Sequence, residues 1–194
     1  MFVGRVLGLD VSTSIIGVTV LDAREDGSVD PIVLDHIDFK RCKTLWEKAD
    51  HVRGTFYSWN ELRPSEFHSI SHVFIEEPAM MYSPGMSSAQ TIATLLRFNG
   101  LVSFFAREAW RDPEYISASA ARKLIGIKTQ QVKKCGVSHK LQAFRHVMEN
   151  DLKHVVWPTK KKSDKVVDWA ADVVDSYVIA RAGLELLNKS QTGE

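Results

Sequence analysis

The sequence predicts an α/β layered fold in which three antiparallel strands precede strands that alternate with helices. The first forty residues contain three runs rich in Val, Ile and Leu, separated by segments of turn composition. From residue 44 onward, apolar residues recur at three- and four-residue spacings, which is typical of amphipathic helices. The order of these patterns indicates a mixed sheet flanked by helices. With 194 residues, we expect a single domain spanning residues 1–194.

The N-terminal strands are predicted from three segments: RVLGLDV (5–11), SIIGVTVLD (14–22) and PIVLDHIDF (31–39). The turn compositions VSTS and REDGSVDP separate them, so they should form an antiparallel meander. A helix is expected from Thr44 to about Leu62, and Pro64 marks its end. The segment HVFIEE, residues 72–77, then predicts a short buried strand.

A loop at residues 78–88, PAMMYSPGMSS, leads into a long helix predicted from about Ser87 to Ala109. This helix is apolar around most of its circumference, with Arg97 and Asn99 as the main interruptions. Such a pattern indicates burial on more than one side. The sequence leaves two arrangements open, a central core helix or a helix that packs on its own sheet and on a second subunit.

The remaining elements follow at short intervals. We expect a fifth strand at EYISAS (114–119), a short helix at SAARKLIG with Ser119 as its cap, and a helix at SHKLQAFRHVMEND capped by Ser138. A polar connection, HVVWPTKKKSDK, should join these to a final, mostly apolar helix that includes DWAADVVD.

Positive charge is concentrated in residues 117–148, although the whole chain carries a net charge of only +1. This segment contains no acidic residue, and its basic residues are Arg122, Lys123, Lys128, Lys133, Lys134, Lys140 and Arg145. A basic segment near carboxylates suits a metal-dependent enzyme that acts on a polyanion, because it draws phosphates toward groups that would repel them. A solvated basic face is the alternative interpretation.

Other features narrow the cellular setting. The chain has no run of 18 apolar residues and no basic segment leading into an apolar one, so we expect neither a membrane-spanning nor a secreted protein. Cys42 and Cys135 lie far apart without a CxxC motif, which argues against zinc and favours reduced thiols in a cytoplasmic protein. The sequence is also compatible with a single disulfide between these two cysteines.

Acidic residues occur at three places in the predicted elements. Asp10 ends the first strand, Glu76 and Glu77 end the fourth, and the final helix carries Asp168, Asp172 and Asp175. At about 100° per residue, the last three would share one narrow helical stripe. Buried carboxylates must be paired, protonated or bound to a cation. Oxygen ligands without clustered Cys or His favour Mg²⁺ or Mn²⁺. Two such ions about 4 Å apart could activate water and stabilise the leaving oxygen of a phosphodiester.

Three segments, LGLDVSTSIIGVTVLD, VFIEEP and DVVDSYVIARAG, resemble the RuvC-type Holliday junction resolvases of the RNase H-like superfamily. Their order and spacing match along nearly the whole chain. The resemblance implies an RNase H-like fold with a five-stranded mixed sheet. It also implies a homodimer that resolves four-way DNA junctions by paired, Mg²⁺-dependent nicking and leaves 5′-phosphate and 3′-hydroxyl ends.

The resemblance also implies roles for individual residues. By position, the catalytic and metal-binding residues would be Asp10, Glu76, Asp172 and Asp175. Glu77 is the rival of Glu76, and Asp168 would be a helix cap or a supporting group. Candidate DNA contacts are Tyr82, which is the aromatic closest to the Glu strand, and Arg122, Lys123, Lys128, Lys133, Lys134 and Lys140. The helix at residues 87–109 would form the dimer interface.

Two alternative functions stay in view. The strand-turn-strand LGLDVSTSIIGVTVLD also resembles the phosphate-binding segment of actin-like sugar kinases and ATPases. Those proteins need two such domains and a second phosphate loop, and this chain is too short and lacks a later Gly-rich D-x-G turn. An RNA-processing nuclease or a non-cleaving nucleic-acid-binding relative of the resolvases is the other alternative.

Overall fold

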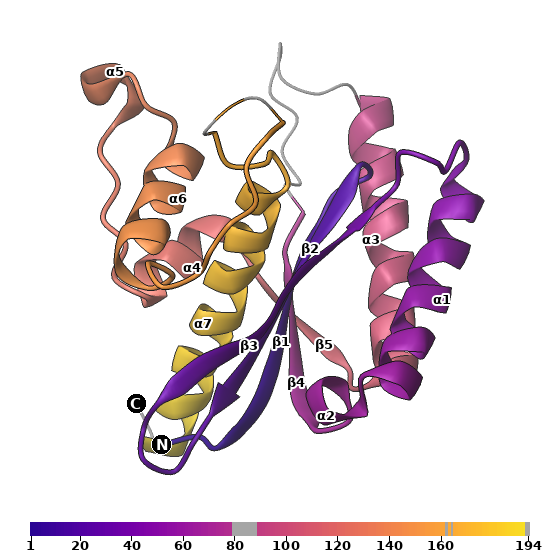
Figure 1. Ribbon diagram of the computed structural model, residues 1–194, viewed down its shortest axis with the longest axis horizontal. Coiled ribbons are helices and arrows are strands. Elements are labelled where there is room, and N and C mark those ends of the chain that lie inside the picture. Colours follow the sequence, from indigo (N-terminus) through magenta and orange to yellow (C-terminus); the bar gives the residue numbers. More distant parts are fainter. Residues whose placement is uncertain (79–88, 162, 164, 193–194) are drawn as a thin grey trace.

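A five-stranded mixed sheet runs through the centre of the computed structural model, which describes residues 1–78, 89–161, 163 and 165–192 (Figure 1). The strands are β1 (Gly4–Val11), β2 (Ile15–Ala23), β3 (Val29–Asp38), β4 (Ile70–Glu76) and β5 (Pro113–Ile116), in the spatial order β3-β2-β1-β4-β5. The first three strands pair antiparallel, whereas β4 runs parallel to β1 and β5 runs parallel to β4. The predicted mixed α/β sheet is therefore confirmed.

Helices cover both faces of this sheet. They are α1 (Leu45–Leu62), α2 (Pro64–Phe67), α3 (Ala89–Ala109), α4 (Ala118–Leu124), α5 (Val132–Cys135), α6 (His139–Asn150) and α7 (Ala170–Thr192). Figure 1 shows α1 and α3 on one face and α7 on the other, with α4 and α6 on the outer side of α7. The short helices α2 and α5 were not predicted. No helix in the described parts of the chain is long and apolar enough to cross a membrane.

The helix caps test the helix starts that the sequence predicted. Thr44 and Glu47 form a capping box at the start of α1, because the Thr44 hydroxyl accepts from the Glu47 amide and the Glu47 carboxylate accepts from the Thr44 amide. Ser138 caps α6 as predicted. For α4 the prediction was wrong: the cap is Ser117, not Ser119, because the strand ends at Ile116 and the helix begins at once.

Two apolar cores lie on opposite faces of the sheet. On β1, Leu7 and Leu9 pack against the α1 and α3 side, whereas Val6 packs against the α7 side. Since side chains alternate along a strand, Gly8 and Asp10 also face α7. The register of β1 thus turns an acidic side chain toward the final helix.

The backbone of α7 lies unusually close to the sheet, because glycines meet it there. A Cβ atom added at Gly17 of β2 would stand 2.0 Å from the Asp172 carbonyl oxygen, and one added at Gly8 would stand 2.4 Å from the Ser176 carbonyl oxygen. A buried hydrogen bond of 2.8 Å between the Thr19 and Ser176 hydroxyls also joins β2 to α7. These contacts fix the depth of α7 over the sheet.

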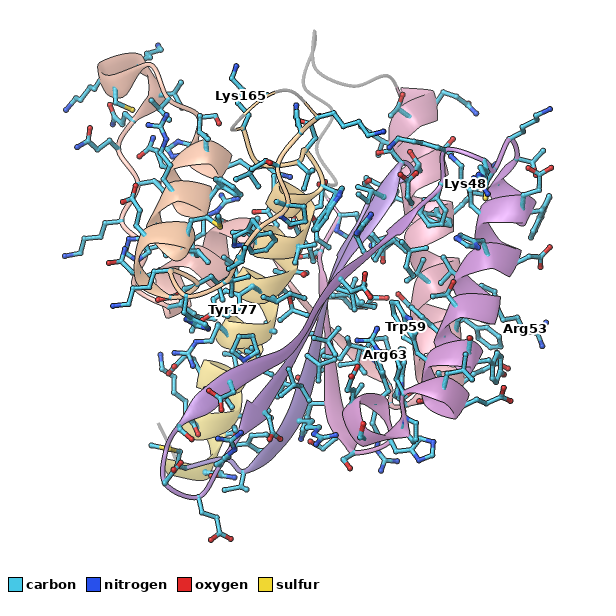
Figure 2. The ribbon with its side chains drawn as sticks, in the orientation of Figure 1. Lys48, Arg53, Trp59, Arg63, Lys165 and Tyr177 are labelled. Atoms are coloured by element: carbon cyan, nitrogen blue, oxygen red, sulfur yellow. The ribbon has the colours of Figure 1, made fainter. Side chains whose placement is uncertain are left out.

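Aromatic and charged side chains join α1 and α2 to the face of the sheet opposite α7. Trp59 and Arg63 lie between α1 and the sheet (Figure 2). The Trp59 ring stacks on Phe67, with ring centroids 4.9 Å apart, and the Arg63 guanidinium pairs with Asp35 of β3 at 3.0 Å. The two cysteines, in contrast, form no cross-link and are free thiols.

Candidate active site

Two of the predicted acids lie side by side at the carboxyl ends of neighbouring parallel strands. Leu9 of β1 is level with Ile75 of β4, so the next residues, Asp10 and Glu76, emerge together. Glu76 alternates with Phe74, which packs toward α7, and therefore faces the same side as Asp10. Glu77 follows the end of β4 and is exposed, so Glu76 is the glutamate that the structure places beside Asp10.

The turn after Asp10 is held from both sides. The Ser12 hydroxyl accepts from the Ile15 amide at 3.1 Å and donates to the Ile15 carbonyl at 2.8 Å, closing the β1–β2 hairpin. The Lys48 ammonium of α1 donates to the Thr13 carbonyl at 2.6 Å, and Figure 2 shows Lys48 at this end of the helix. Asp10 consequently stands on a fixed backbone.

Helix α7 brings two further carboxylates to Asp10. Asp172 lies in its first turn, and Asp175 lies in the next turn and is only 7% exposed. Glu76, Asp175 and Asp172 all act electrostatically on the Asp10 carboxyl, so acids from β1, β4 and α7 share one site. Asp168, by contrast, precedes the helix, is 89% exposed at its side chain and pairs with Lys160 at 2.5 Å. The predicted stripe of three helical acids is therefore wrong for Asp168.

Burial and mutual repulsion favour protonation in this site. Burial is the largest cause that raises the pKa of Asp10 well above its ordinary value, followed by the negative charges of Glu76 and Asp175. Burial also raises the pKa of Glu76, again with Asp175 as a repelling neighbour. The pKa of Asp175 is raised by burial despite the opposing attraction of a nearby ammonium. The cluster therefore has excess negative charge that a cation would relieve.

Lys140 of α6 supplies that ammonium. Its Nζ lies 2.6 Å from Asp175 Oδ2 and 3.3 Å from Asp172 Oδ1. Burial lowers the Lys140 pKa, but the carboxylates of Asp175, Asp10 and Asp172 outweigh that effect and raise it overall. Lys140 was predicted only as a DNA contact, and its place among the acids was missed because 32 residues separate it from Asp172.

The donor set fits a hard divalent cation in chemistry and charge. Four carboxylates face two basic side chains that act on them, Lys140 and Arg122, which leaves a negative excess. Carboxylate oxygens are the ligands that Mg²⁺ prefers. Within the described residues, however, no three Asp, Glu, His or Cys side chains are close enough to hold one ion together. An ion would have to compete with Lys140 for Asp172 and Asp175.

The other predicted DNA contacts are spread beyond this cluster. Arg122, Lys123 and Lys128 line a pocket of about 460 Å³ between α4 and the start of α6. The two lysines of α5, at positions 133 and 134, are exposed. Tyr82 lies outside the described residues. Within the basic segment, Arg122 and Lys140 are therefore residues whose charges act on the acids.

Comparisons with known proteins agree at the level of structure. No protein-family model and no curated protein sequence matches the chain. Thermus thermophilus RuvC matches with a TM-score of 0.63 over 96% of both chains at 14% identity. The same protein in complex with a Holliday junction substrate gives 0.62 over 95% of both chains at 12% identity. The yeast mitochondrial Holliday junction resolvase gives 0.58 over 97% of this chain and 81% of its own at 13% identity.

At these identities the likeness concerns the fold, and it extends over nearly the whole chain. The chain therefore has the RNase H-like α/β fold of RuvC and other Holliday junction resolvases.

Proposed function

We propose that this protein is a structure-selective endonuclease that resolves four-way DNA junctions by metal-dependent phosphodiester hydrolysis. The observation that carries the proposal is that Asp10, Glu76, Asp172 and Asp175 gather on a RuvC-like fold, where their negative charges act on one another. The T. thermophilus protein with this fold has been solved with a Holliday junction substrate, which supports branched DNA as the substrate here. Residues 1–194 would form the one nuclease domain.

Each part of the site has a task in this reaction. Asp10, Glu76, Asp172 and Asp175 would hold Mg²⁺, or Mn²⁺ in its place, in a two-ion site. The ions would lower the pKa of a bound water and neutralise charge on the scissile phosphate. Asp10 and Glu76 are fixed by the parallel register of β1 and β4, so their separation does not depend on a loop. In-line attack by water would leave 5′-phosphate and 3′-hydroxyl ends.

A homodimer would place two such sites on one junction. On the outer side of α3, Leu96, Gly100 and Phe104 recur every fourth residue and are exposed, Leu96 by 36% and Phe104 by 52%. Large apolar side chains on one exposed helical face suit an isologous contact between two copies. The stripe lies on α3, which the structure describes as Ala89–Ala109 and which contains most of the predicted interface helix.

The test of function is a panel of labelled substrates. A four-way junction, a flap, a linear duplex and an RNA–DNA hybrid are each incubated with Mg²⁺ and with chelator. We expect cleavage of the junction alone, and only with Mg²⁺. Preferential cutting of the RNA–DNA hybrid would favour an RNA-processing nuclease, and tight binding without any cutting would favour a non-cleaving relative.

Asp168, Asp172 and Asp175 should contribute unequally to junction cleavage. Asp172→Ala or Asp175→Ala is expected to lower junction cleavage by about 10²- to 10³-fold, the usual cost of removing one charge-stabilising group. Asp168→Ala should lower it by less than about fivefold, because an exposed ion pair contributes at most about 1 kcal/mol. Single-turnover rates of the three variants check this order. Equal losses would contradict it.

Bound metal should be able to replace the Lys140 ammonium as the group that stabilises Asp172 and Asp175. Lys140→Ala leaves Asp172 and Asp175 without their ammonium, so we expect a loss of about 1–2 kcal/mol in the free energy of unfolding in chelator. That value lies below the range for fully buried pairs because the Lys140 side chain is half exposed. Mg²⁺ should raise the melting temperature of this variant more than that of the wild type. Lys133→Ala, at an exposed position on α5, is the control.

A further inference from the structure

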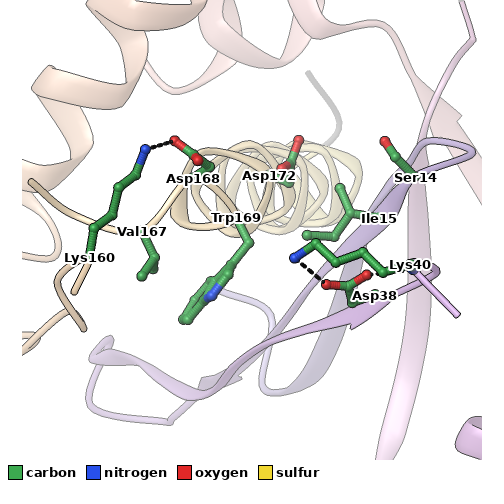
Figure 3. Close-up of a pocket in the computed structure, with 9 residues that line it drawn as sticks. All are labelled: Ser14, Ile15, Asp38, Lys40, Lys160, Val167, Asp168, Trp169 and Asp172. Atoms are coloured by element: carbon green, nitrogen blue, oxygen red, sulfur yellow. Dashed lines mark hydrogen bonds and ion pairs between the residues drawn. The ribbon is translucent and has the colours of Figure 1, made fainter.

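A second hollow adjoins the candidate active site. It has a volume of about 490 Å³, within the range of small-ligand sites. Figure 3 shows its lining: Ser14, Ile15, Asp38, Lys40, Lys160, Val167, Asp168, Trp169 and Asp172. Asp172 belongs both to this hollow and to the acid cluster. A ligand in the hollow would therefore lie next to Asp172, one of the carboxylates proposed to act in strand cleavage.

Trp169 provides a rigid aromatic wall. Its indole stacks on His36 of β3, with ring centroids 4.3 Å apart and an interplanar angle of 12°. Trp157 packs against it at 6.2 Å between centroids. His36 does not line the hollow whereas Trp169 does, so the histidine supports the indole from the side away from the hollow. The Trp169 ring is thus backed by two other rings yet remains partly exposed.

The backbone of Trp169 fixes this ring relative to the acids. Its carbonyl oxygen accepts from the Asp172 amide at 3.1 Å and from the Val173 amide at 3.2 Å. The residue therefore forms part of the first turn that carries Asp172. The indole and the catalytic carboxylate are consequently parts of one rigid unit.

The charges around the hollow are balanced in pairs. Lys40 pairs with Asp38 at 2.9 Å, and Lys160 pairs with Asp168 at 2.5 Å, as the dashed lines in Figure 3 mark. Apart from Asp172, the hollow is therefore neutral, with apolar side chains from Ile15 and Val167 beside the indole. A flat, neutral, aromatic group matches this lining better than a phosphate does. In a DNA substrate that group is a nucleobase.

We propose that this hollow is a stacking subsite for an unpaired nucleobase next to the scissile phosphate, with Trp169 as the stacking residue. The inference rests on the proposed junction cleavage and adds a contact that holds the strand beside the acids. Bases stack on aromatic side chains with little regard to sequence, since every base has a π-face. Taking a base out of the stack costs least where its pairing is already weakened, which we infer for the point of strand exchange in a junction.

The test is a double-mutant cycle between protein and DNA. The wild-type cleavage position is first mapped, and an abasic site is then placed at each nucleotide that flanks it. Equilibrium binding in chelator is measured for the wild type and for Trp169→Leu, which keeps apolar volume but removes the ring. On intact junctions, Trp169→Leu should bind about 5- to 150-fold more weakly. At one flanking position the abasic site should weaken the wild type by a similar factor and Trp169→Leu hardly further.

Two controls accompany the cycle. Trp169→Phe keeps a ring and should retain most of the coupling, and it serves also if Trp169→Leu does not fold. Tyr57→Ala removes an exposed aromatic from α1, on the other face of the sheet, and should leave the coupling intact. If the wild type cuts the junction but the losses add at both flanking positions, the subsite is wrong and the proposed function stands. If the wild type does not cut the junction, the proposed function fails and the subsite fails with it.

Discussion

Asp10→Asn is expected to abolish junction cleavage while leaving junction binding intact. The substitution keeps the shape of the side chain on β1 but removes a charged oxygen from the site where Glu76, Asp172 and Asp175 meet. We expect the cleavage rate to fall by at least about 10²- to 10³-fold. Binding depends on contacts with DNA phosphates, to which a carboxylate contributes only repulsion. Retained cleavage by this variant would contradict the assignment of Asp10.

The same substitution should stabilise the protein at neutral pH. Burial and neighbouring carboxylates raise the pKa of Asp10 in the folded state, whereas in the unfolded chain it is about 3.9. The unfolded state therefore releases its proton first, and stability falls as pH rises from about 4 through the folded-state pKa. Asn carries no such cost. In chelator, Asp10→Asn should melt several degrees above the wild type at pH 7.5, since about 1 kcal/mol shifts the melting temperature by roughly 2–4 °C.

The difference in melting temperature should shrink as the pH falls toward 4 and disappear below about pH 3, where the Asp10 carboxyl is protonated in both states. Mg²⁺ should narrow it at pH 7.5 by stabilising the wild type alone. Asp50→Asn, at an exposed position on α1, is the matched control and should show neither effect. An Asp10→Asn variant that melts below the wild type at pH 7.5 would show that the Asp10 charge is satisfied in the folded protein.

Gly17→Ala should damage both stability and cleavage, although Gly17 carries no functional group. The added methyl would stand 2.0 Å from the carbonyl oxygen of Asp172 and 2.9 Å from the Val173 amide nitrogen. Backbone atoms cannot move aside as a flexible side chain can, so the start of α7 must shift away from β2. We expect a loss of about 1–3 kcal/mol in the free energy of unfolding, typical of overpacking. The cleavage rate should fall by more than the loss of folded protein explains, because Asp172 moves with the helix.

Gly54→Ala is the matched control for this prediction. Gly54 lies on the exposed side of α1, and a Cβ atom there would have no neighbour within 4 Å. Alanine favours the helix by about 1 kcal/mol over glycine, so the control should melt slightly above the wild type. Chemical denaturation and single-turnover cleavage of both variants distinguish the outcomes. A fully stable and active Gly17→Ala protein would mean that α7 is not held at this depth.

Local patterns in the sequence predicted the sheet and the strand-end acids well. Apolar runs ended by Asp10 and Glu76 mark strands whose ends can meet, and the parallel register of β1 and β4 brings them together. The choice between Glu76 and Glu77 was harder, because a shift of one residue reverses the face of a strand. The structure places Glu76 on the α7 side through its alternation with Phe74.

Features that depend on tertiary packing could not be predicted in this way. Asp168 fits the helical period of Asp172 and Asp175, yet the helix begins only at Ala170. Lys140 reaches the acids because α6 packs against α7, a contact that no local pattern encodes. The stacking of His36 on Trp169 likewise joins β3 to the start of α7. For Lys140 and Trp169 the partner is distant in sequence and is selected by the arrangement of whole elements.

The most direct measurement of the central claim maps the cuts on a single four-way junction. Each strand is labelled in turn, the protein is added with Mg²⁺, and the products are then offered to DNA ligase. The account predicts two nicks at symmetric positions on opposing strands, both sealed by ligase because they carry 5′-phosphate and 3′-hydroxyl ends, and none with Asp10→Asn. An intact junction, or cuts that fall equally on linear duplex DNA, would contradict it.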